Sequence, residues 1–544
     1  MTTTGLLRRL ATGALLAVAL SSLPIPSTLR AQAQEAAAPA NDPSGAATGL
    51  AKDVVVKDPA NPTLPEVMDT VGHNKIAINM MWTLLCGFLV MFMQAGFAAV
   101  ETGFTRAKNV AHTMSMNFMI YPIGMIGYWI CGFALQMGGV GAVGALGGTP
   151  GLNHEVVVNL FGHPFGLFGT QGFFLSGDTY DVGVFTLFLF QMVFMDTAGT
   201  IPTGAMAERW KWASFCIFGA FMSMLIYPIY ANWVWGGGWL SQLGANFGLG
   251  HGHVDFAGSS VVHMVGGVAA VAGAIVLGPR IGKFTRDGEP LAIPGHHIPM
   301  AIVGTFILAF GWFGFNAGST LAGGDFRIGV IATNTMLAGS AGALTAMFYV
   351  WLRFGKPDPS MLANGLLAGL VAITAPCAFV NSVSAVIIGG IAGVLVVLAV
   401  MFVERTLKID DPVGAIAVHC VNGMWGIVCV GLFADGVYGD GLNGVPGGVR
   451  GLFYGDPSQL MASIIGIAAC WAWVFPMFYA FFKVVDVLVG NRVSAEAEIA
   501  GLDMPEMGAM GYPDFVLTPG PHGTPAGHGG GPTPRPVLEP VRGN

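Results

Sequence analysis

Residues 255–267 read DFAGSSVVHMVGG, and residues 411–423 read DPVGAIAVHCVNG. The two stretches carry Asp, Gly, Val, His, Val and Gly at six equivalent positions, and in each an aspartate precedes a histidine by eight residues. Each stretch opens a long apolar segment, so an ionisable side chain is repeated in apolar surroundings. A repeat of this kind indicates a protein built from two halves on one plan.

The composition indicates that these surroundings are a lipid bilayer. Of 544 residues, 53% are hydrophobic and 10% are charged, and the mean hydropathy is +0.66. Soluble domains carry about 25% charged residues, so the composition excludes a disordered chain and argues against an ordinary soluble enzyme. A net charge of −7 without a basic stripe argues against nucleic-acid binding. The seven cysteines lie in apolar segments and form no CxxC pair, which predicts buried thiols.

Eleven apolar segments have about the length needed to cross the hydrocarbon core. They cover residues 76–99, 112–136, 183–206, 213–235, 257–278, 299–319, 328–352, 361–380, 384–403, 413–433 and 459–482. The connections on one side hold eleven basic residues, whereas those on the other side hold only Arg327 and Arg450. By the positive-inside rule, this asymmetry predicts an N-terminus outside the cell and a cytoplasmic C-terminus.

The repeat falls on the fifth and the tenth of these segments. Because five crossings separate the copies, they run through the membrane in opposite directions. The sequence therefore predicts an all-α polytopic membrane protein of eleven transmembrane helices, with a 5+5 inverted repeat plus a final helix. Such proteins place their substrate site near the bilayer midplane, at the interface between the repeats.

The ends of the chain predict separate segments. A short basic start, an apolar run and the small-x-small site at 31–33 predict a cleaved signal peptide over residues 1–33. We expect a flexible external segment at 34–75, the membrane domain at 76–485 and a cytoplasmic regulatory segment at 486–515. The Pro/Gly-rich composition of residues 516–544 predicts a disordered tail.

The repeated ionisable residues have different expected roles. Asp255 and Asp411 each fall at the start of a helix, where a carboxylate accepts bonds from free N–H groups, so we interpret both as structural caps. Of twelve histidines, only His263 and His419 lie deep in apolar segments, which indicates a function. Three uses are open: a metal site, for which three ligands are usual, a bis-histidine haem, or a polar pair in an apolar pore.

Eight stretches in order along the chain resemble the ammonium transporters of the Amt/Mep/Rh superfamily. They are RAKN (106–109), GAMAER (204–209), VWGGG (234–238), DFAGSSVVH (255–263), GWFGFNAGS (311–319), AGLVAITAPCAFV (368–380), DDPVGAIAVHCVNGMWG (410–426) and RVSAEAEIAGLD (492–503). The resemblance covers about residues 76–515. It implies the ammonium-transporter fold, a homotrimer in the bacterial cytoplasmic (inner) membrane, and nitrogen uptake by transport rather than an enzyme reaction, with no metal or cofactor.

The resemblance also implies roles for individual residues. Trp235 corresponds to the aromatic side chain that receives the cation at the outer mouth, and Ser319 to the hydroxyl that accepts a hydrogen bond from it. Phe194 and Phe315 correspond to the two gate rings, and Phe190 to a further aromatic residue of the vestibule. The remaining correspondences are the pore pair, His263 and His419, and the aspartate that shapes the outer site, Asp255.

The mechanism that the resemblance implies is selective transport of ammonium. The cation is deprotonated at the phenylalanine gate, and ammonia crosses an apolar pore past the histidines. Net ammonium transport and neutral ammonia transport both stay open. The alternative on the same fold is an ammonium sensor that signals through the C-terminal tail. A PII-type signalling protein is a possible partner at the cytoplasmic face.

Four positions depart from the common pattern of this family. Asp196 stands in the middle of a span, either paired with a helix terminus or beside a proton path. Cys420 and Asn422 adjoin the pore histidine, where they can alter its hydrogen bonding. Asn364 stands where serine is frequent. These differences do not change the family resemblance. They concern whether net ammonium or neutral ammonia is transported.

Overall fold

The computed structural model describes residues 64–141, 143–147 and 152–513. The predicted signal peptide at 1–33, most of the segment predicted at 34–75 and the tail predicted at 516–544 lie outside these residues.

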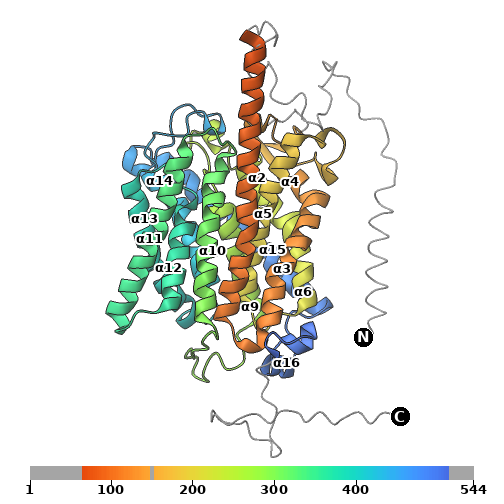
Figure 1. Cartoon of the computed structure of the whole chain (residues 1–544), viewed down its shortest axis with the longest axis vertical. Helices are drawn as coiled ribbons and strands as arrows, with labels where there is room; N and C mark the ends of the chain where they lie inside the picture. Colours follow the sequence, from red (N-terminus) through yellow and green to blue (C-terminus); the bar gives the residue numbers. More distant parts are fainter. Residues whose placement is uncertain (1–63, 142, 148–151, 514–544) are drawn as a thin grey trace, which may run out of the picture. The chain divides into compact units, whose positions relative to one another are not determined.

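Long helices lie side by side through the described chain (Figure 1). In the first half they are α2 (Leu64–Phe104), α3 (Val110–Gly127) continued by η2 (Tyr128–Gly132) and α4 (Phe133–Met137), α5 (Val182–Ala205), α6 (Trp212–Phe221) continued by η6 (Met222–Ile226) and α7 (Tyr227–Trp235), and η7 (Ser259–Met264) continued by α9 (Val265–Leu277). In the second half they are α10 (Ile298–Asn316) with η8 (Ala317–Thr320), α11 (Arg327–Phe354), α12 (Pro359–Thr374), α13 (Ser382–Arg405), and η9 (Ile416–Val421) continued by α14 (Asn422–Phe433). The final long helix is α15 (Pro457–Leu488).

Ten of the helices in the described part are long and apolar enough to cross a membrane, and α12 is a shorter apolar helix. The prediction of a polytopic helical membrane protein is confirmed, whereas the count of eleven depends on α12. The span expected at 361–380 was too long at its end, because α12 stops at Thr374. Pro376 explains the stop, since proline has no N–H to donate and its ring clashes with the carbonyl four residues earlier.

The first helix begins earlier than the sequence predicted. We expected an irregular segment up to residue 75, but α2 already begins at Leu64, so this part of the prediction was wrong. Pro65 and Glu66 account for the start. Proline is favoured in the first turn of a helix, and an acidic side chain there complements the helix dipole.

A two-stranded hairpin lies between α4 and α5 and was not predicted. Strand β1 (Glu155–Leu160) pairs antiparallel with β2 (His163–Gly169). Phe161 and Gly162 form the loop, and both have positive φ angles, of 54° and 81°. Two-residue hairpin loops of this form suit the twist of paired strands, and the run of valines in β1 favours a strand.

Burial separates central helices from peripheral ones. Helix α5 and the η7–α9 pair are almost wholly enclosed by other elements, whereas α2, α11 and α15 expose much of their apolar surface. Exposed apolar helices are the expected outer surface of a protein whose solvent is lipid. The candidate site therefore lies among the central helices.

The two repeats have the same local structure and meet at two glycines. Each repeated histidine lies in a π-helical segment, His263 in η7 and His419 in η9. Such segments occur mostly at functional sites. A Cβ atom on Gly267 would lie 2.4 Å from the backbone nitrogen of Cys420, and one on Gly423 would lie 2.6 Å from the carbonyl oxygen of Ser259. Small residues at these equivalent positions let the helices approach closely.

The segment after α15 folds against the loops at one end of the helices, which is called the α16 end below (Figure 1). It contains α16 (Ala495–Ala500) and η12 (Asp503–Met507). Lys108 donates hydrogen bonds to the carbonyl oxygens of Glu498 and Ile499, and Asp503 accepts one from the backbone N–H of His112. These contacts attach the segment to the start of α3.

Candidate functional site

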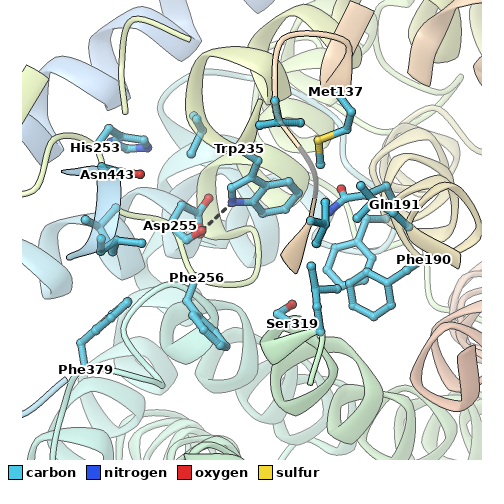
Figure 2. A pocket seen from close by; sticks show the side chains of 18 residues that line it. Met137, Phe190, Gln191, Trp235, His253, Asp255, Phe256, Ser319, Phe379 and Asn443 are labelled. Atoms are coloured by element: carbon cyan, nitrogen blue, oxygen red, sulfur yellow. Dashed lines mark hydrogen bonds between the residues drawn. The ribbon is translucent and has the colours of Figure 1, made fainter. Parts of the chain in front are cut away.

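A cavity of about 350 Å³ opens at the end opposite to α16, which is called the Trp235 end below. Its walls are mostly apolar and aromatic, with a few polar side chains among them (Figure 2). The polar members are Gln191, His253, Asp255, Ser319 and Asn443. An apolar hollow with a few convergent polar groups is the usual form of a small-molecule site.

Trp235 is held in place by the loop of the first repeat. Its ring nitrogen donates a hydrogen bond of 2.7 Å to the carbonyl oxygen of Asp255 (Figure 2). The carboxylate of Asp255 accepts bonds from the Ser260 hydroxyl and from four backbone N–H groups, those of Gly258, Ser259, Ser260 and Val261. Asp255 therefore caps η7 and fixes the loop that orients the tryptophan.

Ser319 lines the same cavity and presents a hydrogen-bond acceptor to it (Figure 2). Its hydroxyl donates its one proton to the carbonyl oxygen of Phe315 at 2.8 Å. The oxygen lone pairs stay available to a guest, because a hydroxyl has one donor and two acceptor positions. With the face of Trp235, this acceptor suits a small cation that carries N–H groups.

Stacked phenylalanine rings close the floor of the cavity. The centroids of Phe194 and Phe315 lie 4.2 Å apart with 22° between the ring planes, and the exposed fractions are 1% and 0%. Phe190 packs against Phe194 at 4.7 Å, and Trp235 lies 6.0 Å from Phe194. The predicted gate and vestibule residues are thus brought together, and the closed rings separate the cavity from what lies beneath.

The two repeated histidines lie directly beneath the gate. His263 stacks on Phe315 with centroids 5.4 Å apart, and its Nδ1 lies 3.2 Å from Nδ1 of His419. One Nδ1 must donate and the other accept, so the rings are complementary tautomers. Nε2 of His263 has no hydrogen-bond partner among the described residues, which leaves it to contact a guest.

This geometry does not suit a bis-histidine haem. The rings are hydrogen-bonded to each other, so no porphyrin and iron fit between their nitrogens. Within the described ranges, no group of three His, Cys, Asp or Glu side chains is placed to hold a metal ion.

Beyond His419 the path continues toward the α16 end. A cavity of about 20 Å³ is lined by His419, Glu101 and Asn364, among others. Asn364 also lines a larger hollow of about 580 Å³, together with Asp411 and Arg280. From the Trp235 end to the α16 end, the order is therefore the first cavity, the stacked phenylalanine rings, the two histidines, the small cavity and the large hollow.

Asp411 has the capping geometry expected from the repeat. Its carboxylate accepts bonds from the backbone N–H groups of Gly414 at 3.0 Å and Ile416 at 2.7 Å. Burial raises the pKa of Asp411. Burial also opposes the ionisation of the adjacent Asp410, but Arg209 and Arg280 outweigh this effect and lower the pKa of Asp410 to about 2.

The departures from the family pattern have specific partners. Asp196 accepts a 2.5 Å hydrogen bond from the amide of Gln94, which lies within α2, and its position beside a proton path stays a prediction. Cys420 is buried and packs against Gly267. Asn422 and Asn364 each donate to a backbone carbonyl, those of Ala417 and Val413.

Sequence reasoning missed several residues of the site. Trp312 stacks on His263 with centroids 5.4 Å apart, and its ring nitrogen donates to the Thr374 hydroxyl. Trp312 could have been found from the sequence, since it is part of the GWFGFNAGS stretch that resembles the family. Gln191, His253 and Glu101 were also missed, and for Glu101 no repeat or spacing pointed to the pore.

The long apolar helices define a polytopic membrane protein with cavities among its central helices. The chain matches the Ammonium Transporter Family over residues 81–512. It is 46% identical to ammonium transporter Amt2 of Archaeoglobus fulgidus over 457 residues, which cover 84% of this chain and 92% of the relative. It is 36% identical to ammonium transporter 1 member 2 of Oryza sativa, covering 75% of this chain and 81% of the relative.

Two solved structures share the fold. One is titled "Sensor Amt Protein", with a TM-score of 0.69, 35% identity and coverage of 80% of this chain and 99% of that chain. The other is the crystal structure of Mep2 of Candida albicans, with a TM-score of 0.64, 27% identity and coverage of 77% and 87%. The chain belongs to the ammonium transporter family, and it is a membrane protein.

Proposed function

We propose that this protein carries ammonium selectively across the membrane in which it is embedded. One observation carries the proposal: a cation-receiving cavity, a closed aromatic gate and a buried histidine pair lie in series. Trp235 and Ser319 line the cavity, and Phe315 of the gate stacks on His263. Membership of the ammonium transporter family supports the substrate.

Selectivity begins at the cavity of the Trp235 end. Ammonium and potassium have similar sizes, so a size filter does not separate them. The Ser319 oxygen accepts a hydrogen bond, which ammonium donates and potassium does not. The Trp235 face adds a cation–π attraction of roughly 0.5–2 kcal/mol.

The gate is where the cation loses a proton, which passes to water on the side of the Trp235 cavity. The rings of Phe194 and Phe315 are stacked and almost fully buried, so a charged species meets apolar surroundings there. A charge at such depth is costly, whereas neutral ammonia is not charged. Deprotonation before the gate therefore lowers the barrier to entry.

His263 and His419 receive ammonia beneath the gate. Neutral imidazoles each provide one donor and one acceptor, so they hydrogen-bond a small polar guest without adding charge. Their mutual bond of 3.2 Å keeps the rings in register along the path. A narrow conduit of this kind excludes hydrated ions.

We also propose the surroundings of the transporter. The distribution of basic residues among the loops favours a cytoplasmic α16 end and an external Trp235 end, and the proposed location is the bacterial inner membrane. A homotrimer is the proposed assembly. The segment around α16 is the proposed contact for a PII-type protein.

An ammonium-concentration jump on proteoliposomes tests the function. We expect a transient current with ammonium that is absent with potassium if transport is electrogenic, or an internal pH rise without current if neutral ammonia crosses. His263→Ala should lower selectivity or flux at least tenfold, because the polar conduit is broken. Wild-type protein that gives neither current nor pH change would overturn the proposal.

A sensor is the second candidate, because one similar structure carries that title. A sensor binds ammonium at the Trp235 cavity and needs no flux. Ammonium binding to the purified protein, with neither current nor internal pH change, would favour the sensor over the transporter.

A further inference from the structure

Glu101 places a carboxyl group close to the end of α2, beside His419 in the small cavity described above. Its exposed fraction is 3%, and it lines the cavity of about 20 Å³ that also contacts His419. A space of this volume holds one small polar molecule, such as a water or an ammonia. Ionisable side chains at this depth are costly and usually mark a pathway.

The hydrogen bonds of Glu101 come from neutral groups. Asn117 donates from its amide nitrogen at 2.8 Å, and the Thr203 hydroxyl lies 2.8 and 2.9 Å from the two carboxylate oxygens. Among the ion pairs of the described residues, none involves Glu101. The carboxyl therefore has no basic side chain to fix its charge, and it can take up a proton or face a cation.

The partners of Glu101 are themselves fixed in orientation. Asn117 accepts a bond from Thr200 at its amide oxygen, and its amide nitrogen also donates to the carbonyl oxygen of Thr113. The donor side of this amide is thereby turned toward Glu101. Helices α2, α3 and α5 together hold one carboxyl group in a defined place beside the path.

The position of Glu101 follows that of His419 along the path. Both line the small cavity, and Asn364 joins this cavity to the hollow of about 580 Å³ at the α16 end. The other titratable group in the small cavity is His419, and Asp411 lies close enough for its charge to act on Glu101. The large hollow adds acids and bases of its own: Asp358, Glu404, Arg280, Lys283 and Arg405.

We propose that Glu101 is the proton-exchange site at the inner end of the pore, where ammonia becomes ammonium again. The protonated carboxyl gives its proton to the lone pair of ammonia, so an O–H bond breaks and an N–H bond forms. Ammonium then leaves through the larger hollow, and a cytoplasmic proton restores the carboxyl. This inference rests on the proposed transport function. It adds to that function the residue at which ammonia is protonated before it leaves.

The test compares Glu101→Gln with wild type in proteoliposomes, using radiolabelled methylammonium uptake and the ammonium-evoked current or pH change. Glutamine has nearly the same shape and can still accept the bonds from Asn117 and Thr203. We expect the maximal rate to fall at least tenfold, with the half-saturating external concentration within twofold. A lower maximal rate with an unchanged half-saturating concentration would assign the defect to the release of ammonium and not to its binding at the Trp235 cavity.

Three further variants keep the test decisive if Glu101→Gln is poorly folded. Glu101→Asp keeps an acid and should retain at least a third of the rate. Thr203→Val removes a hydrogen bond to Glu101 but leaves the acid, and should stay within threefold. Glu289→Gln removes an exposed carboxylate that lines neither the small cavity nor the large hollow, and serves as the matched control within twofold.

The outcomes distinguish this proposal from the proposed function. Uptake by wild type with equal uptake by Glu101→Gln overturns the role of Glu101 alone. A loss in Thr203→Val as large as in Glu101→Gln, without rescue by Glu101→Asp, indicates a packing role and also overturns it. A wild type without any uptake overturns the transport function itself.

Discussion

The loops around Asp255 and Asp411 share one geometry and differ in what surrounds it. Each carboxylate accepts bonds from the backbone N–H groups three and five positions further along the chain. At the first loop the Ser260 hydroxyl also donates to Asp255, whereas Ile416 occupies the equivalent place in the second repeat. The repeat therefore conserves how each helix begins, and not the polar groups beside it.

The residues next to the two aspartates are not repeated, and they differ between the two ends. At the Trp235 end, His253 lies 2.9 Å from the Ser260 hydroxyl, and the equivalent of His253 in the second repeat is Ile409. At the α16 end, Asp410 pairs with Arg280, which also pairs with Glu208. A histidine thus joins the polar groups around the first aspartate, whereas a buried ion pair lies next to the second.

The largest expected difference between the ends is the cost of removing the aspartate. Hydrogen bonds to a charged group contribute about 1.5–3 kcal/mol each, so Asp411→Ala, which loses two such bonds, should cost about 3–6 kcal/mol, and Asp255→Ala, which loses five, should cost more. Thermal unfolding of the detergent-purified variants measures both losses. Equal losses would contradict the conclusion that the first loop is held by more bonds.

The next effect is a pH dependence that arises from His253 at the Trp235 end. Burial lowers the pKa of His253 from 6.5 to about 4, although nearby Asp255 acts in the opposite direction. Between pH 6.5 and 4, His253 is protonated in the unfolded chain and neutral in the folded chain, so the free energy of unfolding falls as the pH drops through this range. The loss is about 3 kcal/mol, at about 1.4 kcal/mol per pKa unit.

His253→Gln measures this effect, because glutamine does not titrate and can still bond the Ser260 hydroxyl. The variant should lose less thermal stability than wild type between pH 6.5 and 4. A parallel decline in both proteins would assign the pH dependence to other groups.

The smallest effect should be the same in both repeats, because it concerns the contact that they share. Gly267→Ala and Gly423→Ala each place a Cβ atom within 2.6 Å of backbone atoms of the other repeat. Overpacking of this kind costs about 1–3 kcal/mol. Gly390→Ala is the control, since its Cβ would meet only a methyl group of Thr345 at 3.6 Å. Unequal losses at the two glycines would show that the crossing is asymmetric.

Much of the fold was predictable because it depends on local properties of the chain. Apolar length located the spans, and the helices begin and end within a few residues of most expected positions. The errors arose where a few residues decide a boundary: Pro376 shortened α12, and Pro65 with Glu66 started α2 early. The hairpin between α4 and α5 was missed because apolar runs were considered only as helices.

The site was predictable where residues repeat or lie in a recognised stretch. Trp235, Ser319 and the gate rings were expected together, and the structure places them around one cavity and its floor. Partners from other helices were not predictable. Nothing in the sequence near Asp196 points to Gln94.

The sequence by itself therefore determined the membrane-spanning class and the repeat with its two histidines, since hydropathy and spacing are properties of the chain as written, and its motifs indicated the family. The tertiary structure alone decided that Glu101 shares a cavity with His419, and that His253 bonds Ser260 beside Asp255. The physical reason is that hydrogen bonds and cavities depend on distances of a few ångströms between helices, which only their packing sets.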